Sequence, residues 1–505
     1  MSKTTTIRLL PRGAQLVLPR GTALREPLAS FGMEFPCGGE GRCGSCRIRV
    51  LEGALLVTPE DKSALTEEEI ATGWRLGCRA RATGSLTLEV GQWVTPILAD
   101  FEKMTPSVFG GLGIAIDLGT TTVVAQLLDL GSGDVLGVRS GLNPQAAYGA
   151  DVMSRVAFAL RDNRLTVMVR RFIGKMVSEL AGDRVHELRE VVLVGNTVMH
   201  HLFTGLSVES LSHVPFQAFD LREQSFARSD LGWPLPASTR VRFLRCLGGF
   251  VGSDILAGIL ATEISQAGQP MALMDLGTNG EIVLGNRRGI LCASTAAGPA
   301  FEGGCIRMGM RAATGAISQV FIRDGALECH VIGDTAPRGI CGSGLVDAVS
   351  AGLKLGAILP NGRLRNNDSR EFPLSQPVAL TQSDIRQLQL AKGALACGLR
   401  ILLDVAGVTI DEVEHLYLAG AFGNYIRILS ACRLGLIEVA ADKVTPAGNT
   451  ALRGAKIALL SPGIENKISV THVSLESHPS FQGAFVDCLA FPPASRELNR
   501  MESLS

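Results

Sequence analysis

The feature that most constrains this chain is a glycine-rich run of cysteines near its N-terminus. Cys37, Cys43 and Cys46 follow the spacing C-x5-C-x2-C, and Cys78 stands well beyond them. Clustered thiols in a chain without a secretory signal favour a metal site over disulfides. A zinc ribbon normally offers two C-x2-C pairs, whereas this run has one. The spacing therefore predicts a 2Fe-2S cluster, in a loop one residue longer than the plant-type C-x4-C-x2-C pattern.

Glycines fill the spaces between these cysteines, at positions 38, 39, 41 and 44. They allow the backbone to wrap tightly around the metal ions and to turn its N–H groups toward the sulfurs. Such donors offset the negative charge of four thiolates and so help to set the reduction potential. A structural zinc site or free cysteines are the alternative interpretation.

Length and composition exclude several classes of protein. The 505 residues are enough for roughly three domains. Because 46% of them are apolar, with a mean hydropathy of +0.25, we expect large buried cores. Basic and acidic residues number 48 each, which argues against a nucleic-acid binder. No apolar run approaches the roughly 18 residues of a membrane span, and residues 1–12 lack a signal-peptide core. A cytoplasmic protein without membrane contact is expected, its other cysteines acting as small buried apolar residues.

The N-terminal part alternates short strands and helices around the cysteine run. We expect a hairpin of strands at 4–10 and 14–18, a helix from an N-cap at Thr22 to about Phe31, a strand at 47–51, an acidic helix at about 60–70 and a strand at 85–90. This order resembles the ferredoxin β-grasp fold, which we assign to residues 1–95. Residues 96–112 are expected to form a linker that is long enough for the first domain to shift.

An internal repeat organises the rest of the chain. Residues 113–122 (GIAIDLGTTT) recur as residues 271–280 (MALMDLGTNG). Each copy predicts an apolar strand, an Asp, a Gly-Thr turn and a second strand. A repeat this long is not that of a solenoid. It predicts two similar α/β halves that face each other across a cleft.

Each of these turns has the chemistry of a phosphate site. Backbone N–H groups and hydroxyls of the turn can cradle phosphate oxygens, and glycine allows close approach. Asp117 and Asp275, at the strand ends, can hold Mg²⁺ through water, because this ion prefers oxygen ligands and keeps much of its hydration. The turn residues expected to bind ATP are Gly119, Thr120, Thr121, Gly277, Thr278 and Asn279. No Walker A sequence and no strand followed by G-x-G-x-x-G is present, which argues against P-loop and Rossmann folds.

A third glycine turn lies in the stretch HLYLAGAFGN, which begins at His415. Two phosphate motifs and a late glycine motif resemble the acetate kinase/Hsp70/actin (ASKHA) ATPase superfamily. The resemblance implies an ATPase domain over the residues that follow the linker, with lobes at about 113–268 and 269–505. It also implies an adenosine site at the third turn, on Gly420, Ala421 and Phe422.

Two helices are expected to begin beside these turns. The sequence after Cys341 opens a helix, and a helix N-terminus attracts phosphate, so Gly342, Ser343 and Gly344 are candidate nucleotide contacts. The helix after the third glycine turn is expected at about 424–434.

Several polar residues have two interpretations. Asn196 follows an apolar strand, where the superfamily places a residue that orients the attacking water, but it could equally cap the next helix. His200 and His201 on that helix could reach a corrinoid or a partner, although core histidines are more common. Three further residues could line the cleft or serve as turns and caps, namely Asn143, Gln145 and Asp151.

The combination of domains resembles the reductive activators of corrinoid enzymes, which join a 2Fe-2S ferredoxin domain to this ATPase. Six further stretches carry the resemblance: residues 143–145, 148–152, 194–201, 294–303, 339–347 and 417–425. Two positions depart from the family pattern. Ala421 stands where a second glycine is expected, and Arg427 stands where an acid is usual. Some relatives carry a middle region between ferredoxin and ATPase, where we expect only the short linker here.

The resemblance implies an ATP-dependent electron-transfer enzyme. The ferredoxin domain would receive an electron from an upstream reductase or ferredoxin. It would pass that electron to a corrinoid protein whose cobalt has slipped to Co(II), and so return the cobalt to Co(I). The ATPase would dock on the corrinoid protein and drive the transfer, and a homodimer is compatible with this scheme.

Three alternatives stay open at this point. The chain could be a small-molecule kinase of the same superfamily with the cluster as a redox sensor. It could be the activator of a 2-hydroxyacyl-CoA dehydratase, although such activators hold a 4Fe-4S cluster between subunits and this chain lacks a second cysteine pair. It could also be a simple ferredoxin whose ATPase half only acts as a scaffold.

The purified chain is expected to contain iron and acid-labile sulfide, and to bind an adenine nucleotide. Metal analysis, an absorption spectrum and a nucleotide-binding titration would check both properties. Zinc in place of iron, or no affinity for adenine nucleotides, would contradict this interpretation.

Overall fold

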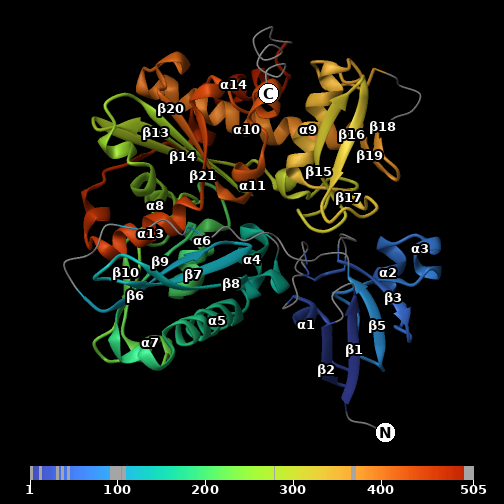
Figure 1. The fold of residues 1–505 in the computed structure, drawn as a ribbon, viewed down its shortest axis with the longest axis horizontal. Coiled ribbons are helices and arrows are strands. Elements are labelled where there is room, and N and C mark those ends of the chain that lie inside the picture. The colour runs from blue at the N-terminus through green and yellow to red at the C-terminus, as the bar shows by residue number, and fades with distance from the viewer. Residues whose placement is uncertain are drawn as a thin grey trace.

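The computed structural model describes residues 4–10, 14–29, 33, 35, 39–41, 46–90, 100, 104, 110–149, 151–277, 279–365 and 371–493. A small N-terminal sheet domain lies against a larger body built of two stacked halves (Figure 1). Three residues that are predicted to bind ligands lie outside these ranges, namely Cys37, Cys43 and Thr278.

The N-terminal domain is a five-stranded mixed sheet in the order β2-β1-β5-β3-β4. Its strands are β1 (Thr4–Leu10), β2 (Ala14–Pro19), β3 (Arg47–Glu52), β4 (Trp74–Leu76) and β5 (Leu86–Val90). The hairpin β1–β2 is antiparallel, and β1 pairs in parallel with β5. Alternate residues of β1, such as Ile7 and Leu9, are buried, which fixes the register of the sheet. The β-grasp expectation is confirmed, and we call this part the ferredoxin-like domain.

Two helix predictions in this domain were wrong in detail. The first helix, α1, spans Arg25–Ala29 and is not capped by Thr22, whose hydroxyl donates to the Pro19 carbonyl at 2.7 Å. The acidic helix is two helices, α2 (Pro59–Ala64) and α3 (Glu67–Ala71). Each begins with its own capping box, because Thr58 and Thr66 both cap the turn that follows them.

The body contains two six-stranded sheets of matching design. In lobe 1 the order is β10-β11-β9-β6-β7-β8, and in lobe 2 it is β21-β20-β12-β13-β14-β22. The strands of lobe 1 are β6 (Leu112–Leu118), β7 (Thr122–Asp129), β8 (Val135–Leu142), β9 (Leu188–Val194), β10 (Gln224–Phe226) and β11 (Arg240–Phe243). Those of lobe 2 are β12 (Met271–Leu276), β13 (Gly280–Asn286), β14 (Gly289–Thr295), β20 (His415–Ala419), β21 (Val444–Gly448) and β22 (Thr471–His472).

Each sheet starts with an antiparallel meander of three strands, and a later strand then pairs in parallel with the first of them. The repeated segments become β6–β7 in lobe 1 and β12–β13 in lobe 2. The duplicated α/β halves predicted from the repeat are therefore confirmed. Lobe 2 also carries a three-stranded sheet of β15 (Ala316–Arg323), β16 (Ala326–Val331) and β17 (Gly339–Ile340), and a hairpin of β18 (Glu371–Ser375) and β19 (Val378–Thr381).

Helices form layers above, between and below the two sheets (Figure 1). Helices α8 (Ser253–Thr262) and α13 (Thr450–Leu460) lie between the sheets, and their apolar residues share one buried cluster with strands of both lobes. Helix α5 (Arg164–Ala181) covers the outer face of lobe 1, and α10 (Gln382–Ala406) covers that of lobe 2. The two lobes therefore share a central apolar layer to which α13, from the C-terminal part of the chain, contributes.

The remaining helices are short. They are α4 (Val152–Ala159), α6 (Thr197–Thr204), α7 (Arg228–Leu231), α9 (Gly342–Lys354), α11 (Gly420–Tyr425), α12 (Ile428–Leu434) and α14 (Phe481–Asp487). The single helix expected at 424–434 is thus two helices, because Ile426 is extended and breaks the helix after Tyr425. Among the described residues, no helix is both long and apolar enough to cross a bilayer.

The ferredoxin-like domain contacts both lobes. On lobe 1, the Tyr148 hydroxyl at the end of the 3-10 helix Pro144–Tyr148 bonds to Glu26 of α1, and Arg164 donates to the same hydroxyl at 3.1 Å. The Arg25 guanidinium lies 4.3 Å from the centre of the Tyr148 ring. On lobe 2, Arg338 forms an ion pair with Glu89 of β5 at 3.3 Å. The domain therefore spans the boundary between the lobes.

Asp100, inside the predicted linker, is fixed to the body. Its backbone carbonyl accepts hydrogen bonds from Gln126 at 2.7 Å and from Lys456 at 3.0 Å. Its carboxylate also forms ion pairs with Lys456 and Arg453. At this point, at least, the chain is anchored rather than free to move.

A buried ion network ties the edge of lobe 1 to the C-terminal part of the chain. Arg242 on β11, with a 2% exposed side chain, pairs with Glu190, Glu223 and Glu465.

We expect Arg242→Met to lower the free energy of unfolding by about 3–5 kcal/mol, because it leaves buried carboxylates without their partner. Arg240→Met on the same strand removes one exposed pair with Glu223 and should cost less than about 1 kcal/mol. Thermal melts of both variants measure the difference, and equal effects would contradict the role given to the network.

Candidate functional site

The two described cysteines of the run lie at one end of a pair of strands. Cys46 directly precedes β3, and Cys78 comes just after β4. In this antiparallel pair Arg47 lies opposite Leu76, and the Gly77 N–H donates to the Cys46 carbonyl at 2.7 Å. Both thiols are buried and neither is in a disulfide. Cys37 and Cys43 lie outside the described residues, so the complete four-thiolate site stays a prediction.

The surroundings of these thiols fit a 2Fe-2S cluster. The buried Asp61 carboxylate accepts the Leu76 N–H at 2.7 Å and so fixes the strand that delivers Cys78. Gly39 and Gly41 in the run have φ of +81° and +80°, a conformation that glycine adopts without strain. Positive φ at these positions is what a loop that wraps around metal ions requires.

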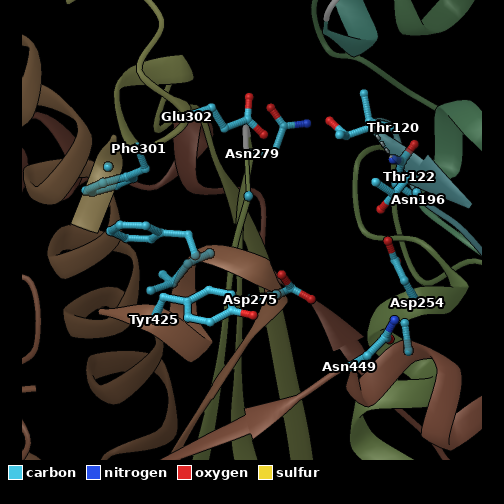
Figure 2. A pocket seen from close by; sticks show the side chains of 18 of the residues that line it. Thr120, Thr122, Asn196, Asp254, Asp275, Asn279, Phe301, Glu302, Tyr425 and Asn449 are labelled. Atoms are coloured by element: carbon cyan, nitrogen blue, oxygen red, sulfur yellow. Dashed lines mark hydrogen bonds between the residues drawn. The ribbon is translucent and has the colours of Figure 1, made fainter. Parts of the chain in front are cut away.

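A second site occupies the cavity between the two lobes. It is lined by the ends of β6 and β12, the turns that follow them, the start of α9, and residues of α8, α11 and α13. Figure 2 shows Thr120, Asn196 and Asp254 on one side and Phe301 and Tyr425 on the other, with Asp275 between them. The repeated segments thus meet across one cavity, as the sequence predicted.

The lobe 1 turn has the form of an anion cradle. Gly119, Thr120 and Thr121 all line the cavity. The Gly119 N–H donates to the Thr122 carbonyl at 3.0 Å, and the Asn143 side chain donates to the Gly119 carbonyl at 2.9 Å. These bonds hold the turn in place at the cavity wall.

The lobe 2 turn faces the first one. Gly277 and Asn279 line the cavity, whereas Thr278 lies outside the described residues. Arg311, from a loop of lobe 2, reaches across and donates to the Thr121 hydroxyl at 3.1 Å. The lobe 1 turn is therefore linked to lobe 2 by a side chain that the sequence had not singled out.

Four carboxyl groups, one buried and three half-buried, give the cavity its electrostatic character. They belong to Asp117, Asp275, Asp254 and Glu281, and in the described part of the chain none forms an ion pair with Lys or Arg. Burial raises the pKa of Asp117 to about 6 despite a hydrogen bond from Asn449. Burial and the charge of Asp117 raise the pKa of Asp275 to about 7. Such a cavity favours a cation, and carboxylate oxygens are the ligands that Mg²⁺ prefers.

Asp254 is the functional candidate that the sequence analysis missed. Burial, followed by the charges of Asp275 and Asp117, raises its pKa to about 8. Burial and the charges of Asp254 and Asp275 likewise raise the pKa of Glu281 well above its usual value. The signal was available, because Asp254 follows the glycine-rich stretch LGGFVGS and opens an apolar helix.

Close packing of two glycines places Asp254 beside Asn196. A Cβ on Gly252 would lie 2.3 Å from the Gly195 carbonyl oxygen, so only glycine permits this approach. The Ser253 N–H donates to the same carbonyl at 2.9 Å. The start of α8 is thereby fixed against the end of β9.

Asn196 caps helix α6 and also faces the cavity. The cap is formed by its side-chain oxygen, which accepts the Met199 N–H at 3.0 Å. Its amide group donates to the Thr120 hydroxyl at 2.9 Å and lines the cavity. A role in orienting water stays a prediction, since the amide already serves the cap and the turn.

Aromatic side chains form the opposite end of the cavity. Phe301 and Phe422 stack with their ring centres 4.6 Å apart, and Tyr425 lies beside them. Gly420 has φ of +79°, and a Cβ there would lie 2.5 Å from the Asp275 carboxylate. This explains the glycine in the third turn. Of Ala421 only the backbone is described, within α11.

Other candidates are placed away from the cavity or inside the fold. At the start of α9, Gly342 and Ser343 line the cavity, but a Cβ on Gly344 would point at the Ile317 carbonyl of β15. Gly344 does not line the cavity and packs closely against β15, so its contact with a nucleotide stays a prediction. Structural roles also explain five further polar residues, which are buried or act as caps, and none of them lines the cavity: Asn143, Gln145, Asp151, His200 and His201.

Family models match three consecutive parts of the chain. Residues 8–83 match the 2Fe-2S iron-sulfur cluster binding domain. Residues 112–267 match the RACo middle region, and residues 269–503 match the C-terminal domain of RACo, the ASKHA domain.

Whole-chain relatives agree with these matches. The chain is 36% identical to the corrinoid activation enzyme RamQ of Eubacterium limosum over 407 residues. The matched region covers 73% of this chain and 68% of RamQ. The chain belongs to this family of corrinoid activation enzymes. Another family member is the Co(II) methylated amine-specific corrinoid protein reductase of Methanosarcina barkeri, 26% identical over 424 residues, or 75% of this chain and 77% of that protein.

A solved structure extends the similarity to the whole fold of this corrinoid activation enzyme. The reductive activator for corrinoid,iron-sulfur protein superposes with a TM-score of 0.64 and 26% identity, covering 98% of this chain and 99% of that chain. One expectation is corrected by these comparisons. The stretch that we took as the first ATPase lobe matches the middle-region model, so a middle region is present rather than missing.

The raised pKa values predict how the acidic cavity affects stability. Because Asp254 titrates near pH 8 in the fold and near pH 4 when unfolded, the folded state holds more protons in this window. The free energy of unfolding should therefore fall as the pH rises from 4 to 8. We expect Asp254→Asn to raise the melting temperature of the metal-free protein, and to do so more at about pH 8 than at pH 6.

The matched control for this prediction is Asp442→Asn, which changes an exposed carboxylate far from the cavity. It should leave the melting temperature unchanged at both pH values. A variant at Asp254 that melts at or below the wild-type temperature at pH 8 would contradict the destabilising role of this carboxyl group.

Proposed function

We propose that this chain is an ATP-dependent reductive activator that transfers one electron from its 2Fe-2S cluster to a Co(II) corrinoid protein and returns the cobalt to Co(I). One observation carries the proposal. A domain of the cluster-binding type contacts both lobes of an acid-lined cleft, in a chain that is 36% identical to a corrinoid activation enzyme. An upstream reductase or ferredoxin supplies the electron.

The cleft binds Mg-ATP between the two phosphate turns. Asp117 and Asp275 would hold the cation, because both carboxylates line the cavity close to the phosphate turns and Mg²⁺ prefers oxygen ligands. The turn of Gly119, Thr120 and Thr121 and the turn of Gly277 and Asn279 cradle the phosphates. The adenine base lies at the aromatic end of the cavity.

Asp254 activates the water that attacks the terminal phosphate. It lies in the cavity beside Asn196, and its pKa of about 8 gives it the basicity of a group that takes a proton near neutral pH. Bound Mg²⁺ neutralises part of the surrounding negative charge and keeps the carboxylate ionised. Asn196 orients the same water through its amide group.

Nucleotide turnover makes an uphill electron transfer possible. A plant-type cluster works near about −400 mV, and Co(II) corrinoids require a lower potential. A gap of about 100 mV for one electron corresponds to roughly 2.3 kcal/mol. A nucleotide-dependent change in affinity for one state of the partner supplies a free energy of this size.

The test mixes the purified chain, a chemical reductant and a purified Co(II) corrinoid methyltransferase protein, with and without Mg-ATP. The absorption of Co(I) should appear with wild type only when ATP is present. Cys78→Ser should lose the reduction and keep ATP hydrolysis, whereas Asp117→Asn should lose both. Reduction of cobalt without ATP would contradict the proposal and favour a simple ferredoxin whose ATPase half acts as a scaffold.

Two variants are the controls. Cys305→Ser removes an exposed thiol outside the cysteine run, and Asp442→Asn removes an exposed carboxylate outside the cavity. Both should reduce cobalt at the wild-type rate. Phosphate transfer to an added sugar or carboxylate, with no reduction of any corrinoid protein, would favour a kinase instead.

A further inference from the structure

Arg311 occupies an unusual position in the nucleotide cavity. It comes from lobe 2, yet its guanidinium donates to the Thr121 hydroxyl in the phosphate turn of lobe 1, at 3.1 Å. Among the described residues that line the cavity, Arg311 is the one basic side chain. Nothing in the sequence around it resembles a phosphate motif.

This guanidinium is well suited to contact a terminal phosphate. Its fork of donors matches phosphate oxygens and can bind them through two bonds, and a phosphate adds the attraction of opposite charge that a hydroxyl lacks. The Thr121 hydroxyl is therefore a weak partner that a bound triphosphate can replace. With a diphosphate the guanidinium returns to Thr121.

The loop of Arg311 is bonded to the small sheet of lobe 2. The Met310 N–H donates to the Ile340 carbonyl at 2.9 Å, and the Ile340 N–H donates to the Met308 carbonyl at 2.9 Å. Ile340 belongs to β17, which also pairs with β15. The residues that directly precede Arg311 are thus bonded to β17.

Strand β17 leads to the ferredoxin-like domain. Arg338 directly precedes β17, and its N–H donates to the Gly315 carbonyl at 2.8 Å. Its side chain pairs with Glu89 on β5 at 3.3 Å, and both side chains are about one-third exposed. An exposed pair of this kind is weak and can break reversibly. Strand β5 in turn pairs with β3, which follows Cys46.

We propose that Arg311 contacts the terminal phosphate of ATP and that its loop communicates the nucleotide state to the ferredoxin-like domain through the Arg338–Glu89 pair. This inference rests on the proposed function, because it assigns a sensor to the same cleft. The contact on lobe 1, between Glu26 and Tyr148, holds the domain at its other side. Release or formation of the Arg338–Glu89 pair then changes how the domain sits on the body.

The first test measures steady-state ATP hydrolysis by the full chain. Arg311→Gln should lower kcat by about 10²–10³-fold, because a charged donor to the transition state is lost, while KM changes far less. Arg311→Lys keeps the charge but not the forked guanidinium, so its kcat should lie between those of the wild type and Arg311→Gln. A wild-type kcat in Arg311→Gln would overturn the phosphate contact.

The second test measures amide hydrogen exchange in β5 and β17, with Mg²⁺ and either a non-hydrolysable ATP analogue or ADP. The wild type should show different exchange in the two nucleotide states. Arg338→Gln should keep the wild-type kcat and lose the difference in β5. Arg323→Gln is the matched control, because Arg323 pairs with Glu328 on the same small sheet, away from the ferredoxin-like domain.

The outcomes separate this inference from the proposed function. Suppose that the chain reduces a corrinoid protein with ATP. Communication through Glu89 is then refuted if exchange in β5 is the same in both nucleotide states, or if Arg338→Gln keeps the wild-type difference between these states. A chain that neither binds nor hydrolyses ATP refutes the proposed function itself.

Discussion

The burial of carboxyl groups where two similar sheets meet is the constraint on which the body of this protein depends. Strands β6 and β12 hold equivalent places in sheets of the same order, and each ends in an aspartate that faces one cavity. Burial of like charges is unfavourable unless a cation compensates them. The stability of the closed cleft is therefore linked to its ligand. A cation with a polyphosphate relieves the repulsion that Asp117, Asp254 and Asp275 impose on each other.

The repeat made most of this architecture predictable. Two similar segments that share the sequence Asp-Leu-Gly-Thr after an apolar strand imply equivalent strands, and equivalent strands in facing halves bring their ends together. Buried strands with continuous apolar runs are also strong local signals. The place of the two turns and their aspartates at one cavity could therefore be predicted from the repeat, while their ligands and the complete set of cluster cysteines stay predictions. Helix limits were less predictable, because two capping boxes within a few residues divide an acidic segment that reads as one helix.

The residues that the sequence did not reveal act through contacts between distant segments. Arg311 meets Thr121 across 190 positions, and Asn449 donates to Asp117 across 332. Tyr148 belongs to a family-like stretch, yet its partner is Glu26 in another domain. No local periodicity encodes such pairs, because each depends on how two folded units dock. A helix start likewise shows which residues come first but not which side faces the cavity: Gly342 and Ser343 line the cavity, whereas Gly344 packs against the Ile317 carbonyl.

The docking of the ferredoxin-like domain on both lobes gives the ATPase a means to influence the electron. A ligand moves an equilibrium only by its different affinity for two states. Electron transfer from cluster to cobalt depends on where the cluster domain sits when the partner is bound. Since one contact of this domain is on lobe 1 and the other on lobe 2, any change in the lobe arrangement must alter at least one of them. The buried apolar residues that α8 and α13 share with strands of both lobes resist large separation of the lobes. Small rotations about this layer are therefore the motions that nucleotide binding can drive, and exposed pairs at the rim are the contacts that such rotations can break.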